Sequence, residues 1–387
     1  MGHFDNICIR PVSGEVVTQG VGTIYQDLPE KGQLSALQVD LASVCEFSTN
    51  PGLDIWNIFT KFEVLVDGSK VVKAYDAKQC RALAHYWGMD LSQLGWYERQ
   101  DTEGDKTFWH FPILFGRYWG DKEYMLDMEQ YSNPQLRITY NADQTTVDGK
   151  TYNASASPYI RSAVEGLVWR GGAPPMMKGY IKSTEIDNWS CVGSTTRQIE
   201  IPRGNNVIGY LQGARYADDK LIDYIERMEL TFDNGEWQVL DHTYRQLQSL
   251  DSMFYPRPVE IRVRKDMRDN MALDLCTGVC NQIGMWNSNI AVDSLRLQHE
   301  GTWNIQAINL SAGGVAVATT HSNDFYISGQ FPHQNIYIPL HKYAEDDEFG
   351  IDSTKYGRMD IKTTTGTGAS TSANLQTVAE FLIPNGE

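Results

Sequence analysis

Residues Phe62–Leu83 read FEVLVDGSKVVKAYDAKQCRAL, and residues Met228–Leu250 read MELTFDNGEWQVLDHTYRQLQSL. Each stretch begins with a strand pattern of alternating apolar and polar residues. A turn containing Gly68 or Gly235 follows, then a second short strand and a helix. Because the two stretches have the same order of elements, they predict that one structural unit occurs twice in the chain.

The start of the helix is marked in the same way in both copies. Asp76 precedes Gln79 by three positions, and Thr243 precedes Gln246 by three positions. In this pattern the first side chain accepts from backbone N–H groups of the first helical turn, and the Gln side chain reaches back. We therefore expect a short capped helix after the hairpin of each copy.

The second copy is longer than the first. FPILFGRY at 111–118 corresponds to YIPLHKY at 337–343, and each is followed by an acidic turn that begins at Asp121 or Asp346. The turn glycines of the two copies lie 167 positions apart, whereas these two aspartates lie 225 apart. We therefore expect an insertion of roughly 58 residues in the second copy.

The boundary between the copies is predicted near residue 172, where GGAPP at 171–175 contains the residues of a linker. We expect a first domain at 1–172, a second domain at 173–387 and a β-rich insertion at about 251–335 within the second. The composition has 33 Gly and 20 Tyr and is 41% hydrophobic, which favours strands and turns. The predicted fold is all-β: two tandem eight-stranded antiparallel jelly-roll sandwiches, each with a short flanking helix.

The charge balance bears on partners and location. The chain has 33 basic and 49 acidic residues, a net charge of −16, so we expect no direct nucleic acid binding. It has no secretory pattern at its start and no apolar stretch of about 20 residues, which predicts a protein made in the cytoplasm. Six cysteines, at 8, 45, 80, 191, 276 and 280, are predicted to be free. Cys276 and Cys280 form a CxxxC, but no second pair or nearby His cluster has the spacing of a zinc site, so we expect no metal there.

Several patterns have both a structural and a chemical interpretation. The acidic pairs Asp121/Glu123 and Asp346/Glu348 favour a structural role in turns, with calcium binding as the alternative. Six tryptophans favour packing in cores and interfaces over a sugar platform: Trp56, Trp87, Trp96, Trp109, Trp119 and Trp169. The TTTGTGASTS run that starts at Thr363 predicts a flexible loop between the last two strands.

No catalytic motif stands out. The eight histidines are scattered, and GxSxG, Walker A and HExxH elements are absent from the sequence. Three Asn-x-Ser triplets, at Asn153, Asn188 and Asn309, are common by chance and come without a secretory pattern. We expect no enzymatic activity, and no catalytic, cofactor-binding or metal-binding residues.

VDGSKVVKAYDAKQCRALAHY at 66–86 and FPILFGRYWGDKEYML at 111–126 resemble segments of double jelly-roll major capsid proteins. This lineage includes tailless, internal-membrane bacteriophages and, more distantly, adenovirus. The resemblance implies a homotrimeric pseudo-hexagonal capsomer in the icosahedral shell of a virion, in contact with neighbouring capsomers and with minor capsid or penton proteins. It also implies that the insertion is an external tower and that both termini lie at a base that faces an internal membrane. The alternative is a tandem β-sandwich that binds carbohydrate or a receptor.

Overall fold

The structure is a computed structural model. It describes residues 2–10, 17–18, 21–44, 59–90, 95–97, 106–141, 146–147, 150–151, 159–171, 176–215, 221–266, 277–287, 299–300, 322–343, 349–371 and 373–386. All structural statements below concern these residues.

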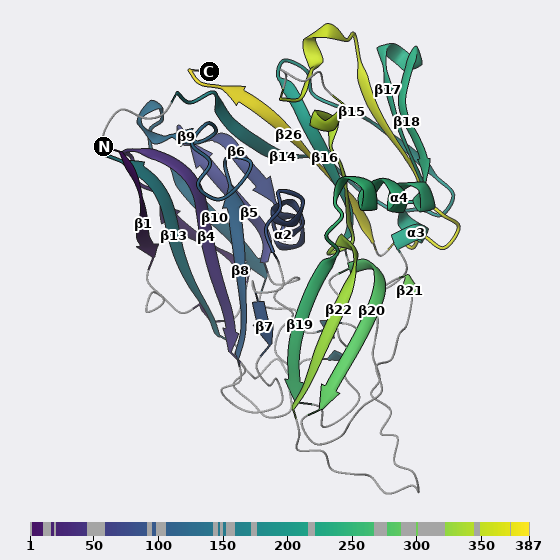
Figure 1. The fold of residues 1–387 in the computed structure, drawn as a ribbon, viewed down its shortest axis with the longest axis horizontal. Helices are drawn as coiled ribbons and strands as arrows, with labels where there is room; N and C mark the ends of the chain where they lie inside the picture. Colours follow the sequence, from purple (N-terminus) through teal and green to yellow (C-terminus); the bar gives the residue numbers. More distant parts are fainter. Residues whose placement is uncertain are drawn as a thin grey trace, which may run out of the picture.

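The first jelly roll is a sandwich of two antiparallel sheets (Figure 1). One sheet has the order β1 (His3–Arg10), β13 (Tyr159–Arg170), β4 (Gln33–Val44), β8 (Lys106–Leu114) and β7 (Gly95–Tyr97); β2 (Val17–Thr18) pairs with β13, and β9 (Leu126–Asp127) pairs with β4. The facing strands are β3 (Val21–Asp27), β10 (Gln135–Asn141), β5 (Phe59–Val66) and β6 (Lys70–Tyr75). A separate hairpin consists of β11 (Thr146–Val147) and β12 (Lys150–Thr151).

The second jelly roll repeats this strand order. Its first sheet is formed by β14 (Gly179–Ser190), β26 (Asn374–Pro384), β16 (Asn206–Arg215) and β23 (Asn335–Ile338), with β24 (Ile351–Asp352) beside β16. Its other sheet is formed by β15 (Thr196–Glu200), β25 (Met359–Thr364), β17 (Arg227–Phe232) and β18 (Trp237–Thr243). The predicted pair of eight-stranded jelly rolls is confirmed.

The hairpin turns of the two copies also match. The first hairpin turns through Asp67 and Gly68 with φ of 51° and 76°, and Asn234 and Gly235 in the second have φ of 58° and 93°. Glycine and short polar residues adopt this left-handed conformation most readily, which explains why they stand at both turns.

The two predicted helices are present as α2 (Ala77–Tyr86) and α4 (Tyr244–Phe254). The Asp76 carboxylate accepts from the Gln79 backbone N–H at 2.7 Å, and the Gln79 side chain accepts from the Asp76 backbone N–H at 2.9 Å. At α4 the Gln246 side chain accepts from the backbone N–H of Thr243 at 2.8 Å. A further short helix, α3 (Leu221–Tyr224), precedes β17.

A third feature shared by the two copies is a capped 3-10 helix at the end of each acidic turn. Asp127 accepts from the Glu129 backbone N–H, and Asp352 accepts from the Thr354 backbone N–H. Each aspartate thereby caps a 3-10 helix, η2 (Met128–Gln130) or η5 (Ser353–Lys355). Two other 3-10 helices are η3 (Asp233–Gly235) and η4 (Leu340–Lys342).

No helix among the described residues is long and apolar enough to cross a bilayer.

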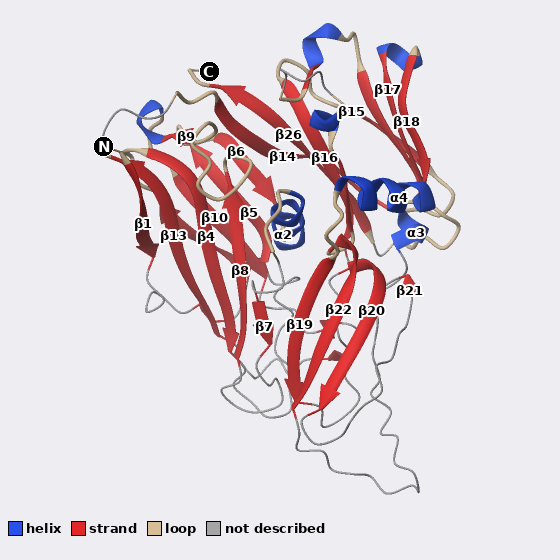
Figure 2. Cartoon of the chain, viewed as in Figure 1, coloured by secondary structure: helices blue, strands red, loops and turns tan. Residues whose placement is uncertain are grey.

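A four-stranded antiparallel sheet is inserted between α4 and β23 (Figure 2). Its order is β19 (Val259–Asp266), β22 (Ser322–Pro332), β20 (Thr277–Asn287) and β21 (His299–Glu300). Its strands extend away from the end of the molecule at which both termini lie (Figure 1). The insertion is therefore β-rich; the sequence segments around Trp303 and Val315 lie outside the described residues.

One feature of the sheets was not predicted from the sequence. Strand β6 of the first jelly roll pairs in parallel with β14 of the second, with Lys73 opposite Ser183 and Ala74 opposite Thr184. This pairing joins the two jelly rolls through one nine-stranded sheet. The buried apolar residues of both halves likewise form one cluster. The two jelly rolls thus share backbone hydrogen bonds and a core.

Candidate functional site: the junction between the jelly rolls

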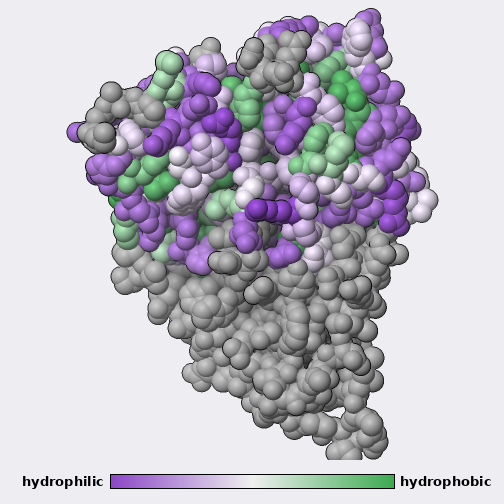
Figure 3. Space-filling model, viewed as in Figure 1, coloured by the Kyte–Doolittle hydropathy of each residue, from purple (hydrophilic) through white to green (hydrophobic). Residues whose placement is uncertain are grey.

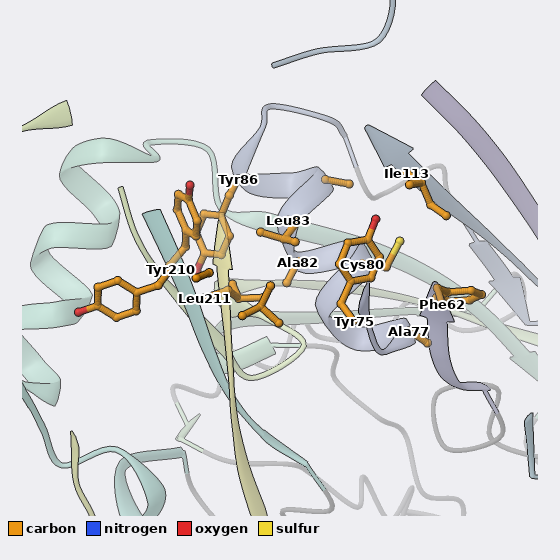
Figure 4. Packing of buried hydrophobic residues seen from close by; sticks show 14 of the residues in the cluster. Phe62, Tyr75, Ala77, Cys80, Ala82, Leu83, Tyr86, Ile113, Tyr210 and Leu211 are labelled. Atoms are coloured by element: carbon orange, nitrogen blue, oxygen red, sulfur yellow. The ribbon is translucent and has the colours of Figure 1, made fainter. Parts of the chain in front are cut away.

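Helix α2 lies between the two jelly rolls (Figure 1). Eight of its ten residues are buried, including small and apolar side chains on several sides of the helix. Figure 4 shows Ala77 and Cys80 beside Phe62 and Ile113 of the first jelly roll, and Leu83 toward Leu211 of the second. A helix that is apolar on most sides must be covered on most sides, so α2 acts as a wedge that both jelly rolls enclose.

A buried polar network lies beside this wedge. The Glu380 carboxylate accepts from the Ser183 hydroxyl at 2.9 Å, the Tyr337 hydroxyl at 2.8 Å and the Trp87 indole N–H at 3.1 Å. Ser183 in turn accepts from the Lys73 ammonium at 2.9 Å. Lys73 and Trp87 belong to the first jelly roll and its helix, and the other three residues to the second. The network therefore crosses the junction.

The charges in this network are enclosed. Lys73 and Glu380 are 2% and 1% exposed. Burial lowers the pKa of Lys73 to about 8, and the Glu380 carboxylate opposes this shift. A buried ion pair contributes little net stability because both ions lose their hydration, but removing one partner leaves the other charge uncompensated. The network thus favours one arrangement of the jelly rolls over others.

An aromatic column continues the junction toward the end of the molecule with the termini. The Trp87 ring stacks on His341 at 5.3 Å between centroids, and both rings contact Phe349. Phe349 lies 5.1 Å from Tyr124, whose ring lies 4.7 Å from the Arg117 guanidinium. Burial lowers the pKa of His341 to about 4, so this imidazole is neutral at pH 7 and stacks as an aromatic ring.

Arg117 also binds the acidic turn of the first copy. Its guanidinium donates to both oxygens of Asp121, at 2.8 and 3.1 Å, and to Glu123 at 3.0 Å. Glu123 also accepts from the ammonium of Lys178, which immediately precedes β14, and its carbonyl accepts from the Lys178 backbone N–H. The acidic turn therefore holds the start of the second jelly roll against the first. We call these four residues the linker clasp.

The structure gives the first acidic turn a structural role. Burial alone would raise the pKa of Asp121, but hydrogen bonds from the Arg117 guanidinium and from two backbone N–H groups lower the pKa below its usual value. Its oxygens are occupied by these donors. Asp346 and Glu348 lie outside the described residues. Among the described residues no group of three or more His, Cys, Asp or Glu side chains could hold a metal ion.

The tryptophans are spread over the fold. Trp109 is 1% exposed beneath the Arg81 guanidinium, which lies 4.8 Å from its ring, and Trp169 packs against Phe4 at 5.2 Å. Trp119 is half-buried, Trp96 belongs to β7 and Trp56 lies outside the described residues. Trp87 lies in the junction and Trp109 in the core of the first jelly roll, whereas Trp237 on β18 is 64% exposed.

The remaining sequence predictions have mixed outcomes. Cys8, Cys80 and Cys191 are free; Cys8 is exposed, and Cys80 and Cys191 are buried. Cys280 belongs to β20, whereas Cys45 and Cys276 lie outside the described residues. Of the Asn-x-Ser triplets, only the one at Asn188 begins within the described residues, on β14.

The polar loop before the last strand differs from the expected flexible loop. It does join β25 to β26, as predicted, but Thr365 is fully buried and its hydroxyl donates to the Val192 carbonyl at 2.5 Å. The Gly366 backbone N–H donates to the Asp223 carbonyl at 2.8 Å. Short polar side chains here satisfy buried backbone groups, so their composition did not indicate mobility.

Sequence reasoning missed Lys73 and Glu380. Each is a charged residue inside an otherwise apolar strand, VVKAY at 71–75 and VAEFLI at 378–383. A charge in such a run is a signal for a buried partner, because an unpaired buried charge is too costly to keep. Nothing in the sequence shows which residue that partner is.

The fold can be compared with known proteins. No protein-family model matches the sequence, and no curated protein sequence matches it. The fold is similar to the crystal structure of the STIV major capsid protein, with a TM-score of 0.55 and 10% identity, over 98% of this chain and 97% of that chain. It is also similar to a chain in the atomic structure of Sulfolobus Turreted Icosahedral Virus, with a TM-score of 0.55 and 11% identity, over 100% of this chain and 92% of that one. The chain therefore has the double jelly-roll fold of these viral capsid proteins along its whole length.

Proposed function

We propose that this chain is the major capsid protein of an icosahedral virus and that three copies form a pseudo-hexagonal capsomer. The observation that carries the proposal is the junction, which fixes two jelly rolls side by side in one chain. Three such chains around a threefold axis place six similar jelly rolls in a ring. The whole-chain similarity to a viral major capsid protein supports this function.

The proposed orientation in the shell follows from the ends of the molecule. We assign residues 1–172 and 173–387 to the two wall-forming jelly rolls, and 251–335 to a tower that projects outward. Both termini lie at the end opposite the inserted sheet (Figure 1), which supports a base that faces the interior and an internal membrane.

The surface suits lateral association. Figure 3 shows hydrophobic patches between hydrophilic ones over both jelly rolls. Large exposed hydrophobic side chains occur on both halves: Val21, Tyr25, Tyr118, Met176, Val192, Trp237, Met253 and Tyr343. Burying such side chains strengthens association between copies and between neighbouring capsomers. Minor capsid or penton proteins are further proposed partners; the role needs no catalytic residue or cofactor.

Light scattering coupled to size-exclusion chromatography tests this proposal. The expected mass is three times that of the 43.8 kDa chain, stable on dilution. A monomer that binds glycans on an array would contradict the capsid function and favour the tandem carbohydrate-binding alternative.

A further inference from the structure

The junction within the chain joins one edge strand of each jelly roll. Strand β6, the second strand of the first hairpin, pairs in parallel with β14, the first strand of the second jelly roll. The equivalent of β6 in the second jelly roll is β18, and the equivalent of β14 in the first jelly roll is β1. The intramolecular pairing therefore uses β6 and β14 and leaves their equivalents, β18 and β1.

Strands β18 and β1 are edge strands. Within the described sheets, β18 pairs only with β17, and β1 pairs only with β13. The two strands lie on opposite sides of the molecule, and both run from the end with the termini toward the inserted sheet (Figure 1). An edge strand presents backbone N–H and C=O groups to which another chain can add a strand. Because β18 and β1 have the same direction, they can pair in parallel between chains, head to tail.

Strands β6 and β18 correspond residue by residue. The turn glycines of the two hairpins are 167 positions apart, and so are the two helix-cap residues. The same spacing relates a β-bulge in each strand, since Val72 of β6 and Val239 of β18 are both left out of the pairing with the preceding strand. The two residues after each bulge are Lys73–Ala74 and Leu240–Asp241. The residues of β6 that pair with β14 therefore correspond to Leu240–Asp241 of β18.

Strands β14 and β1 correspond in the same way. Ile186 of β14 is left out of the pairing with β26, and Ile9 of β1 is left out of the pairing with β13. These two bulges are 177 positions apart. The residues of β14 that pair with β6 are Ser183–Thr184, and they therefore correspond to Asn6–Ile7 of β1.

Aromatic side chains lie at the start of both free edges. Trp237, the first residue of β18, is 64% exposed. The transferred register places it opposite His3, next to Phe4. The equivalent end of the intramolecular junction also has an aromatic contact, since the Tyr180 ring lies edge-on to the Tyr131 ring. Tryptophan is a frequent anchor of protein interfaces, because its burial removes a large apolar area from water.

We propose that β18 of one chain pairs in parallel with β1 of the next chain, and that this pairing closes the trimer. The proposal rests on the capsid function above, because it identifies the contact between the chains of one capsomer. The register of the intramolecular pairing places Asn6 opposite Leu240 and Ile7 opposite Asp241. The next pair is Cys8 opposite His242. Each chain supplies one β18 and one β1, so three chains form a ring in which all contacts are equivalent.

Disulfide cross-linking of the purified protein tests this pairing. Cys8 is free and exposed. Neighbouring strands are about 4.8 Å apart, and a disulfide joins Cα atoms that are roughly 4.4–6.8 Å apart, so a cysteine at position 242 would reach Cys8 of the next chain. After mild oxidation, His242→Cys should give covalent dimers and trimers on a non-reducing gel. No larger species should form, because a head-to-tail ring of three chains has no free end.

Two control variants make the cross-link specific. Adding Cys8→Ser to His242→Cys should abolish the covalent dimer and trimer. Gln198→Cys is the matched control, because Gln198 is exposed on β15, at the other edge of the same sheet as β18. This variant should give no covalent trimer.

The outcomes separate the strand pairing from the capsid function. A trimer by light scattering in which His242→Cys forms no cross-link, or forms the same cross-links after Cys8→Ser, would overturn the pairing and leave the capsid function unaffected. A monomer without cross-links would overturn both.

A second pair of variants decides the matter if His242→Cys does not fold. Trp237→Glu places a charge in the proposed contact and should weaken trimer association, measured by sedimentation on dilution, by about 30-fold. Tyr25→Glu is the matched control, because Tyr25 is a similarly exposed aromatic residue on β3, an edge strand outside the proposed contact. It should associate like the wild type, and equal association of the two variants would reject the pairing.

Discussion

Helices α2 and α4 follow equivalent hairpins and have equivalent capping residues, yet their surroundings differ. Eight of the ten residues of α2 are buried, whereas only Tyr244, Leu247 and Asp251 are buried among the eleven of α4. The first helix is enclosed between the jelly rolls, and the second lies at the base of the inserted sheet. The repeated capped helix therefore has two roles. In the first copy, α2 is a wedge between the jelly rolls; in the second, α4 is a mount that carries the inserted sheet.

The largest loss of stability is expected from removing the Glu380 carboxylate, which lies across the junction from the first jelly roll. Glu380→Ala leaves buried Lys73 without its counter-charge and three donors without their acceptor, so it should lower the free energy of unfolding by about 3–5 kcal/mol. Urea denaturation measures this change. Glu129→Ala, at an exposed site, should stay within about 0.5 kcal/mol of wild type. A similar small effect for Glu380→Ala would mean that the network does not hold the junction.

Equivalent truncations in the two helices compare them directly. Leu83→Ala in α2 should lower the free energy of unfolding by about 3 kcal/mol, because Leu83 is 5% exposed and its loss leaves a cavity. Leu250→Ala in α4 should cost only about 1 kcal/mol, since Leu250 is partly buried. Thermal or urea unfolding of both variants measures the two losses of stability. Equal losses would contradict the difference in burial between α2 and α4.

The linker clasp should contribute less, because the Arg117 side chain is 30% exposed. Arg117→Met should lower the free energy of unfolding by about 2 kcal/mol at pH 7, since it leaves the buried Asp121 carboxylate without its cation.

The pH dependence of this loss has a definite sign. The folded-state pKa of Asp121 is lowered, so its contribution is present above the unfolded pKa and is lost as the pH falls through the folded value. The deficit of Arg117→Met relative to wild type should therefore shrink below about pH 4. Urea titrations at pH 7 and pH 3 measure it, and a deficit that grows in acid would argue against the ion pair.

The two helix caps should each contribute less than the linker clasp. Asp76→Ala should cost about 1–1.5 kcal/mol, because Asp76 is buried and both bonds of its capping box are formed. Thr243→Ala should cost about 0.5 kcal/mol, because Thr243 is exposed and the α4 helix is less enclosed. Differential scanning fluorimetry of both variants shows which substitution costs more stability. A larger loss in Thr243→Ala than in Asp76→Ala would show that the contribution of a cap does not follow the burial of its helix.

The parts of the fold that the sequence predicted are those whose cause is local. Asp67 and Gly68 specify a turn by their own backbone preferences, and Asp76 and Gln79 cap a helix within one turn of chain. Repetition of these patterns was enough to predict two jelly rolls and an insertion.

The junction could not be predicted in this way because its partners are distant in sequence. Lys73 and Ser183 are 110 positions apart, and Tyr86 and Asn335 are 249 apart. Their contacts depend on how the jelly rolls are placed side by side. The parallel pairing of β6 with β14 sets that placement, and local patterns carry no information about it.

Electron microscopy of the purified protein tests the central claim most directly, because it shows the outline of the assembly and the arrangement of the jelly rolls together. We predict class averages with a hexagonal outline and threefold symmetry, in which every chain contributes two upright jelly rolls at a constant angle. Single chains whose two lobes adopt many relative angles would contradict both the locked junction and the capsomer.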